Sequence, residues 1–170
     1  MVTRQRAVRA LSAGFTLIEI LVAMALVGII LGLAVVKLGQ SDAQIAQHEA
    51  ERLAAVLEDA RDEAIAGGRS VAWSSDGHGY QFWLQDDTGS WQAIPNHEIL
   101  KPYELPDILK VSGQTVNLRD QRLGERIVFD TSGVNQPFTI ELVAGEGHWR
   151  LEGDVMGRVS AAREDDQHGG

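Results

Sequence analysis

An uninterrupted apolar segment near the N-terminus is the feature of this 170-residue chain that most restricts its fold. Residues 15–36 read FTLIEILVAMALVGIILGLAVV, in which only Thr16 and Glu19 are distinctly polar. As an α-helix this segment is about 33 Å long, because each residue adds about 1.5 Å. The hydrocarbon core of a bilayer is about 30 Å thick, so the sequence predicts a transmembrane helix over residues 15–36.

A cleaved secretory signal is the alternative interpretation of this segment. The apolar part of such a signal is normally about 7 to 15 residues long and ends at a cleavage site of small residues. The segment here is longer, and its end at residues 34–36, which read AVV, fits such a site poorly. A membrane span is therefore the favoured interpretation.

The charges that flank the span predict its orientation. Arg4, Arg6 and Arg9 precede it in a leader, residues 1–14, that contains no acidic residue, whereas only Lys37 follows it closely. By the positive-inside rule the N-terminus is cytoplasmic, and the rest of the chain lies in the periplasm or outside the cell.

The charge of the whole chain argues against nucleic acid as a partner. The net charge is −9, and removal of the leader would make it −12. Binding to a phosphate backbone normally depends on Lys and Arg side chains that displace counterions, so an acidic surface disfavours it. The chain contains no cysteine, which excludes disulfides, thiolate nucleophiles and cysteine-based zinc sites.

Glu19 places a carboxylate near the start of the predicted span. Insertion scales assign a cost of about 2.5 to 3.5 kcal/mol to an ionised residue at the centre of a bilayer. An ionisable residue in a membrane span is a functional hypothesis by default, and the alternative is a side chain that reaches back to the headgroups.

The sequence around Glu19 resembles a known processing site. Residues 14–19 read GFTLIE, follow a short basic leader and precede an apolar helix, as in type IV pilins and type II secretion pseudopilins. The resemblance implies that a prepilin peptidase cleaves after Gly14, that Phe15 is N-methylated and that assembly depends on Glu19. A buried carboxylate is tolerated only where a cation or hydrogen-bond donors compensate it, and the resemblance implies that a neighbouring subunit supplies the cation.

The helical pattern continues beyond the span as an amphipathic segment over residues 37–66. The apolar positions follow a spacing of three and four residues: Leu53, Val56, Leu57, Ala60 and Ala64. We expect Glu51, Glu58 and Asp62 on the opposite, solvated side. The Gly67-Gly68 pair is a stop signal, so the sequence predicts one long helix from Phe15 to about residue 66.

From Arg69 onward the periodicity changes to two, which predicts half-buried strands. The candidate strands are residues 71–74, 80–84, 91–94, 108–111, 115–118, 126–129, 138–142, 148–151 and 155–160. Turn patterns separate several of them and favour antiparallel pairing. The predicted fold class is α+β, with the pilin-like helix packed on one or two antiparallel sheets of a periplasmic domain, residues 67–162. Residues 95–106 are expected to form an irregular loop, and residues 163–170 a flexible acidic tail.

Three stretches of the soluble part are similar to the general secretion pathway protein H family, the minor pseudopilins of type II secretion, and to related minor type IV pilins. They are residues 53–65, 127–133 and 157–159. The resemblance implies a structural subunit near the tip of a pseudopilus that helps export folded proteins across the outer membrane. The subunit would first be a single-pass inner-membrane protein and then part of the periplasmic pseudopilus. Its implied partners are other minor and major pseudopilins, the prepilin peptidase, the inner-membrane assembly platform, and the secretin or secreted proteins.

Two other filament subunits remain as alternatives. A minor type IV pilin, including one that acts in DNA uptake, would be distinguished by a basic patch or tail, and the tail here is acidic. A major pseudopilin would carry a calcium loop near the C-terminus. Glu164, Asp165 and Asp166 are contiguous and lack the spaced oxygen ligands of such a loop.

An anchored enzyme is the third alternative, and the sequence contains no constellation that favours it. The aspartic-protease-like motif at residues 87–90 occurs once, whereas that chemistry requires two carboxylates. The five histidines lack metal-ligand spacing, so neither catalysis nor a metal or other cofactor is predicted. Tryptophans in strands are usually core residues, but Trp83 is an exception to examine, because its neighbours in phase are glutamines.

Overall fold

The structure, a computed structural model, describes residues 17–164 and gives only the backbone for residues 30–41. Its one long helix, α1 (Leu17–Gly67), has bounds within two residues of those predicted and ends at the expected glycine pair. The chain divides into two compact units, Met1–Gly39 and Gln40–Gly170, and α1 contributes to both.

The predicted membrane span falls partly on residues that the structure does not describe. These are residues 15–16 and the side chains of residues 30–36. In the described part of the chain, no helix is both long and apolar enough to cross a membrane.

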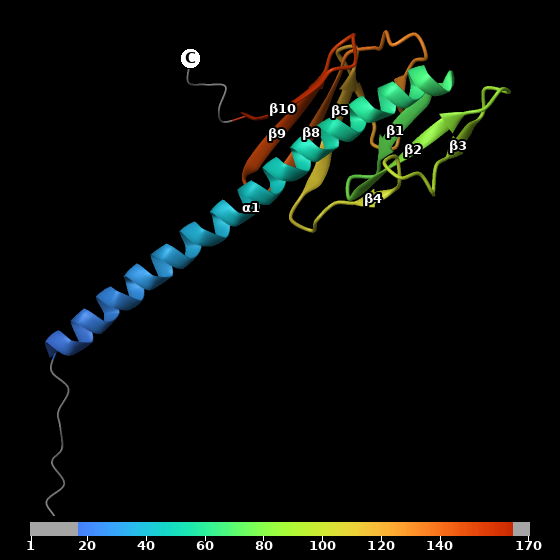
Figure 1. The fold of residues 1–170 in the computed structure, drawn as a ribbon. Coiled ribbons are helices and arrows are strands. Elements are labelled where there is room, and N and C mark those ends of the chain that lie inside the picture. The colour runs from blue at the N-terminus through green and yellow to red at the C-terminus, as the bar shows by residue number, and fades with distance from the viewer. Residues whose placement is uncertain (1–16, 165–170) are drawn as a thin grey trace, which may run out of the picture. The chain divides into compact units, whose positions relative to one another are not determined.

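The second unit contains two antiparallel sheets (Figure 1). The first sheet has the order β3-β2-β1-β7, with β4 also paired to β2, and its strands are β1 (Val71–Ser75), β2 (Gly79–Gln85), β3 (Trp91–Ala93), β4 (Tyr103–Glu104) and β7 (Ile127–Phe129). The second sheet has the order β10-β9-β8-β5-β6, and its strands are β5 (Lys110–Val116), β6 (Arg119–Gln121), β8 (Phe138–Ala144), β9 (Gly147–Gly153) and β10 (Val159–Arg163). This arrangement confirms the predicted α+β fold.

A single apolar core joins the two sheets to residues 42–67 of α1, hereafter the packed segment. In β8 and β9 every second residue is buried, as expected for strands with one face on the core. The fully buried side chains of the core include Trp73, Phe82 and Phe129 from the first sheet and Ile140, Trp149 and Leu151 from the second. The packed segment contributes Ala46, Ala50, Leu53, Leu57, Ala60 and Ala64 to the same cluster.

Two of the predicted strands are wrong as separate elements. The candidates at residues 108–111 and 115–118 belong to one strand, β5, whose register shifts between Val111 and Gly113. This bulge interrupts the two-residue period that the prediction used. Asn117 and Leu118, expected in a strand, form the turn to β6 with φ of 51° and 63°. Such turns usually carry glycine, which explains the missed turn.

The other differences lie in the predicted loop and near the C-terminus. The short strand β4 occurs within the segment expected to be an irregular loop. Residues 155–157 form a turn, and β10 begins at Val159 and continues to Arg163, one residue into the predicted tail. Residues 165–170 of that tail lie outside the described residues.

Candidate functional site

Of the residues predicted to act in processing and assembly, only Glu19 lies in the described part of the chain. Gly14, Phe15 and the three leader arginines lie outside it. Glu19 is in the first turn of α1. A carboxylate there interacts favourably with the positive end of the helix dipole.

Residues 17–29 of α1, hereafter the apolar segment, are exposed at every position. Leu17 is 82% exposed, Met24 is 74% exposed and Ile29 is 59% exposed. A helix that is apolar on all sides is normally buried in a membrane or among other helices. The apolar segment therefore has the surface of a helix that requires a membrane or a partner.

The packed segment differs, because one side of it is buried by small residues and leucines. Alanines at positions 46, 50, 60 and 64 are completely buried, which allows the helix backbone to approach the sheets closely. Leu53 and Leu57 fill the space between these alanines and are also completely buried. This packing holds the domain on the helix.

Two Glu-x-x-Arg pairs flank this apolar stripe and bind the helix to different parts of the domain. They are Glu49 with Arg52 and Glu58 with Arg61. Equivalent residues are nine positions apart, which is about two and a half helical turns and places the pairs on opposite sides of α1. One pair therefore reaches β4 of the first sheet, and the other reaches the β9–β10 hairpin of the second.

The first pair forms a clamp with Tyr103 of β4. Arg52 Nε donates to Glu49 Oε2 at 2.9 Å, and the Tyr103 hydroxyl donates to Glu49 Oε1 at 3.2 Å. The Arg52 guanidinium lies 3.5 Å from the centre of the Tyr103 ring, within the range of a cation–π contact. Desolvation raises the pKa of the Tyr103 hydroxyl above its usual 10, so the hydroxyl also remains a donor in mildly alkaline solution.

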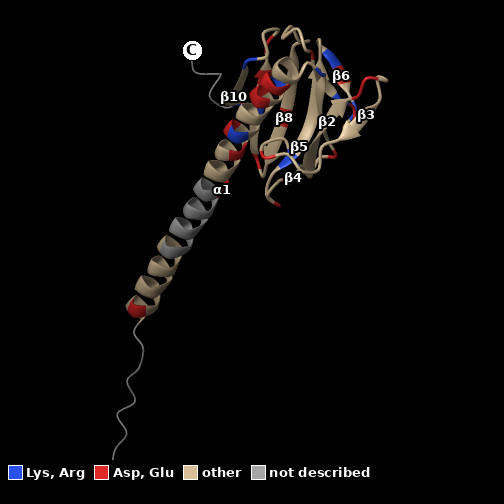
Figure 2. Ribbon diagram, turned by 45° about the vertical axis from the view of Figure 1, so that its right-hand side comes forward, with Lys and Arg blue, Asp and Glu red and all other residues tan. Residues whose placement is uncertain are grey.

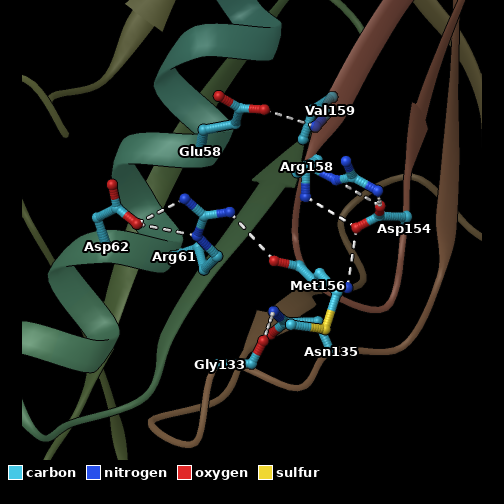
Figure 3. Close-up of polar contacts among 9 residues, drawn as sticks. All are labelled: Glu58, Arg61, Asp62, Gly133, Asn135, Asp154, Met156, Arg158 and Val159. Atoms are coloured by element: carbon cyan, nitrogen blue, oxygen red, sulfur yellow. Dashed lines mark hydrogen bonds and ion pairs between the residues drawn. The ribbon is translucent and has the colours of Figure 1, made fainter.

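The second pair forms a clamp with the β9–β10 hairpin (Figure 3). The backbone N–H of Val159 donates to Glu58 Oε1 at 2.8 Å, and Arg61 Nη1 donates to the Met156 carbonyl at 3.1 Å. Arg61 also donates to the carboxylate of Asp62, at 2.7 Å from Nη2. Glu58 thus satisfies an N–H of β10, the terminal strand of the second sheet.

The hairpin that receives this clamp is itself ordered by Asp154. Its carboxylate accepts hydrogen bonds from the backbone N–H groups of Met156 and Arg158 and from Arg158 Nε. These bonds, led by that from the Arg158 backbone, lower the pKa of Asp154 below its usual 3.8. Asn135 is buried, and its side-chain oxygen accepts a hydrogen bond from the backbone N–H of Asp130. The backbone N–H of Asn135 donates to the Val155 carbonyl and so forms a further contact with the hairpin.

Gly157 is required at the apex of this hairpin for two reasons. Its φ is +73°, a conformation that other residues rarely adopt. A Cβ atom at this position would also overlap the Arg61 side chain and approach Asn135 Nδ2 at 3.0 Å. The glycine therefore permits the close approach of the hairpin to α1.

The sequence interpretation missed both clamps and was wrong about Glu58. It placed Glu58 on a solvated face, whereas the structure places its carboxylate on the N–H of Val159. The sequence contained one indication of the second clamp. Residues 127–133 and 157–159 resemble the family, and both stretches contribute to the hydrogen bonds around the β9–β10 hairpin. Trp83 is half-buried, as its glutamine neighbours indicated, but it is not the exception among the strand tryptophans, because Trp91 in β3 is half-buried as well.

Solved structures with a similar fold define the class of protein. The minor pseudopilin EpsH from the type 2 secretion system of Vibrio cholerae is similar with a TM-score of 0.58 and 17% identity, over 70% of this chain and 96% of that one. The type IV minor pilin FimU of Pseudomonas aeruginosa is similar with a TM-score of 0.51 and 18% identity, over 72% of this chain and 91% of that one. The fold is therefore that of pilin-like subunits.

Sequence relatives identify the family within this class. Residues 49–157 match the family described as type II transport protein GspH, and residues 9–35 match the prokaryotic N-terminal methylation motif. Type II secretion system protein H of Pseudomonas aeruginosa is 30% identical over 137 residues, 79% of this chain and 78% of that one. The protein of that name from Aeromonas hydrophila is 30% identical over 100 residues, 57% of this chain and 54% of that one. The chain belongs to the type II transport protein GspH family, as the resemblance implied.

Proposed function

We propose that this chain acts as a minor pseudopilin, a structural subunit of the type II secretion pseudopilus rather than an enzyme. The observation that carries this conclusion is the family match over residues 49–157, which includes most of the packed segment and both Glu-x-x-Arg pairs. Both curated relatives are named for type II secretion, which favours this function over that of a type IV pilin. The likeness to FimU concerns the fold alone.

The two segments of α1 have separate roles in this proposal. The predicted span at residues 15–36 anchors the subunit in the inner membrane and later packs among the helices of the filament. The apolar exposure of residues 17–29 supports this role, because such a surface is stable only in lipid or against other apolar helices. The packed segment is held to the sheets of the periplasmic domain by the two clamps.

Processing and assembly are proposed to follow the methylation motif. A prepilin peptidase cleaves between Gly14 and Phe15, Phe15 becomes N-methylated, and Glu19 pairs with the terminal amine of a neighbouring subunit. The motif match at residues 9–35 supports this sequence of events. A buried carboxylate without a cation would oppose transfer from lipid to filament, and the pairing removes that cost.

The proposed partners follow from this assembly. They are the other minor and major pseudopilins, the peptidase, the inner-membrane assembly platform, and the secretin or secreted proteins at the filament tip. The leader arginines, Arg4, Arg6 and Arg9, hold the N-terminus in the cytoplasm before cleavage. The domain lies in the periplasm throughout.

The test is the intact mass and N-terminal sequence of the membrane-extracted protein, with and without a prepilin peptidase. We expect a start at methylated Phe15 that depends on the peptidase and is lost in Gly14→Ala. A Glu19→Ala variant should still be cleaved but should fail to enter filaments. Cleavage after the apolar run, or an intact Met1 start in the presence of the peptidase, would contradict the proposal.

A further inference from the structure

Arg126, immediately before β7, is held by aromatic rings rather than by a carboxylate. Its guanidinium carbon lies 4.2 Å from the centre of the Trp83 ring and 5.8 Å from that of Trp91. Its Nε is buried without a hydrogen-bond acceptor, and Arg126 makes no ion pair with any residue that the structure describes. An arginine stays charged in a protein, so this guanidinium carries a charge that no described carboxylate neutralises.

The rings that orient Arg126 belong to the outer face of the first sheet. Val71 and Trp73 face the core, so the alternate residues of β1 face outward. Trp83 is opposite Ala72 in the register, and its Nε1 donates to Ser74 Oγ at 2.9 Å, which fixes the indole. A guanidinium stacked on a fixed ring loses less conformational freedom when it binds a partner.

Beside Arg126 is a small hollow at the junction of the two sheets, hereafter the Arg126 socket. Its volume is about 110 Å³, and it is lined by Val116, Gln121, Arg126, Ile127, Val128 and Gln136. The Oε1 of Gln121 accepts a hydrogen bond from Gln114 Nε2 at 3.1 Å, which leaves the amide nitrogen of Gln121 to donate. The lining contains no acidic side chain. The three polar residues of the lining, Gln121, Arg126 and Gln136, have the donor chemistry that binds a carboxylate.

The size of the socket restricts the occupant. Sites for small molecules usually enclose about 300 to 1,000 Å³. At about 110 Å³ the socket admits only the end group of a side chain. Its surroundings are those of a protein interface, because Trp83 and Trp91 are half-buried and Val128 is 41% exposed. Tryptophan and arginine are the residues most enriched at the energetic centres of such interfaces.

Arginines predominate over acidic residues beside the socket, although Asp120 and Glu125 lie among them. Arg119 and Arg122 are exposed and, among the described residues, make no ion pair. Figure 2 shows basic segments of the ribbon beside β6 and β3. Unpaired arginines on a chain with net charge −9 favour association with an acidic group and specify its orientation.

We propose that the Arg126 socket binds the carboxylate of an Asp or Glu side chain on a neighbouring pilin-like subunit. The identity of this partner rests on the proposed function, whereas the carboxylate chemistry rests on the socket itself. The partner's carboxylate approaches Arg126 between Gln121 and Gln136, and the two tryptophans hold the guanidinium in place.

The experiment measures binding of the full-length chain, in detergent, to each of the other pseudopilins of the same secretion system. Arg126→Gln should raise the Kd for one of them about tenfold or more, because the charged donor is lost. Arg126→Lys should have an intermediate effect, because it retains the charge without the planar donor pair. Lys110→Gln removes an exposed positive charge from β5 and should change the Kd by less than about twofold. Circular dichroism and thermal unfolding establish that each variant is folded.

Two probes test the chemistry of the socket directly. A hexaglutamate peptide should compete with the subunit, hexalysine should not, and added salt should weaken both the subunit and the peptide interactions. An unchanged Kd in folded Arg126→Gln would show that the Arg126 socket does not bind the partner. The subunit would still bind, so that result would not contradict the proposed function. Absence of binding to every pseudopilin would contradict both. If a short DNA duplex binds in an Arg126-dependent manner and no subunit does, the proposed protein partner is wrong and the socket binds phosphate.

Discussion

The apolar segment and the packed segment belong to one helix, but they differ in which side chains are exposed to solvent. Residues 17–29 are exposed on every side, although nearly all of them are apolar. Residues 42–67 bury one apolar side and use charged side chains to bind the domain on both flanks. The difference teaches that a continuous helix can separate two tasks. The packed segment contributes to the core of the domain, whereas the apolar segment leaves an apolar surface uncovered.

The largest expected difference between the segments concerns their leucines. Leu57→Ala should lower the free energy of domain unfolding by about 2 to 5 kcal/mol, because Leu57 is completely buried and a cavity remains. Leu21→Ala should leave it almost unchanged, since Leu21 is 62% exposed. Urea unfolding of the full chain in detergent, followed by tryptophan fluorescence, measures both. Equal losses would show that the two segments are not energetically separate.

The close approach of the hairpin to the packed segment is tested at Gly157. Gly157→Ala should cost about 1 to 3 kcal/mol, because it combines positive φ with overlap of the Arg61 side chain. Gly124→Ala is the matched control, since its φ is +92° but no atom lies within 4 Å of the added Cβ. The same unfolding assay should give the smaller loss for Gly124→Ala. A reversed order would mean that the contact with α1 is not tight.

The charged flank of the packed segment is tested at Glu58. Glu58→Ala should destabilise the domain by about 1 to 2 kcal/mol, because the N–H of Val159 loses its acceptor. Asp59→Ala, one residue along and exposed, should change stability by less than about 0.5 kcal/mol. Hydrogen exchange at the Val159 amide should increase in Glu58→Ala alone. Similar exchange at the Val159 amide in both variants would mean that Glu58 is solvated and does not bind this amide.

The smallest effect is expected from the titration of Asp154. Its pKa in the folded chain is lowered, so its stabilising bonds are present above its usual value of 3.8 and are lost as pH falls through the lower folded pKa. The asparagine in Asp154→Asn does not titrate. The melting temperature of this variant should therefore fall less on acidification than that of the wild-type chain. Thermal unfolding between about pH 5 and pH 2 measures the difference. An identical decrease of the melting temperature in both proteins would mean that the hydrogen bonds of Asp154 do not contribute to domain stability.

Much of the fold could be predicted because the local patterns agree with the tertiary structure. The period of three and four residues placed Leu53, Leu57, Ala60 and Ala64 on the buried side of α1, where they lie. The alternation in β8 and β9 likewise predicted both strands. The prediction failed at Gly113 and Leu118, where a bulge and a left-handed turn interrupt that alternation. A two-residue period contains no information about either feature.

The site could be predicted only where one continuous stretch of sequence carries it. Residues 14–19 form such a stretch, and their roles in processing and assembly stay predictions, which the motif match over residues 9–35 supports. The clamps and the Arg126 socket are not of this kind. Glu58 meets Val159 across 101 positions, and Tyr103 meets Glu49 across 54.

The sequence by itself determined the long helix, its division into an apolar and an amphipathic segment, and the α+β class, because these depend on periodicity along the chain. Only the tertiary structure decided which charges are solvated and which are bound. Glu51 and Glu58 have the same chemistry and lie on one helix, yet Glu51 is exposed while Glu58 accepts a strand N–H. The physical reason is that the role of a polar side chain depends on the groups that folding brings beside it, and those groups are distant in the sequence.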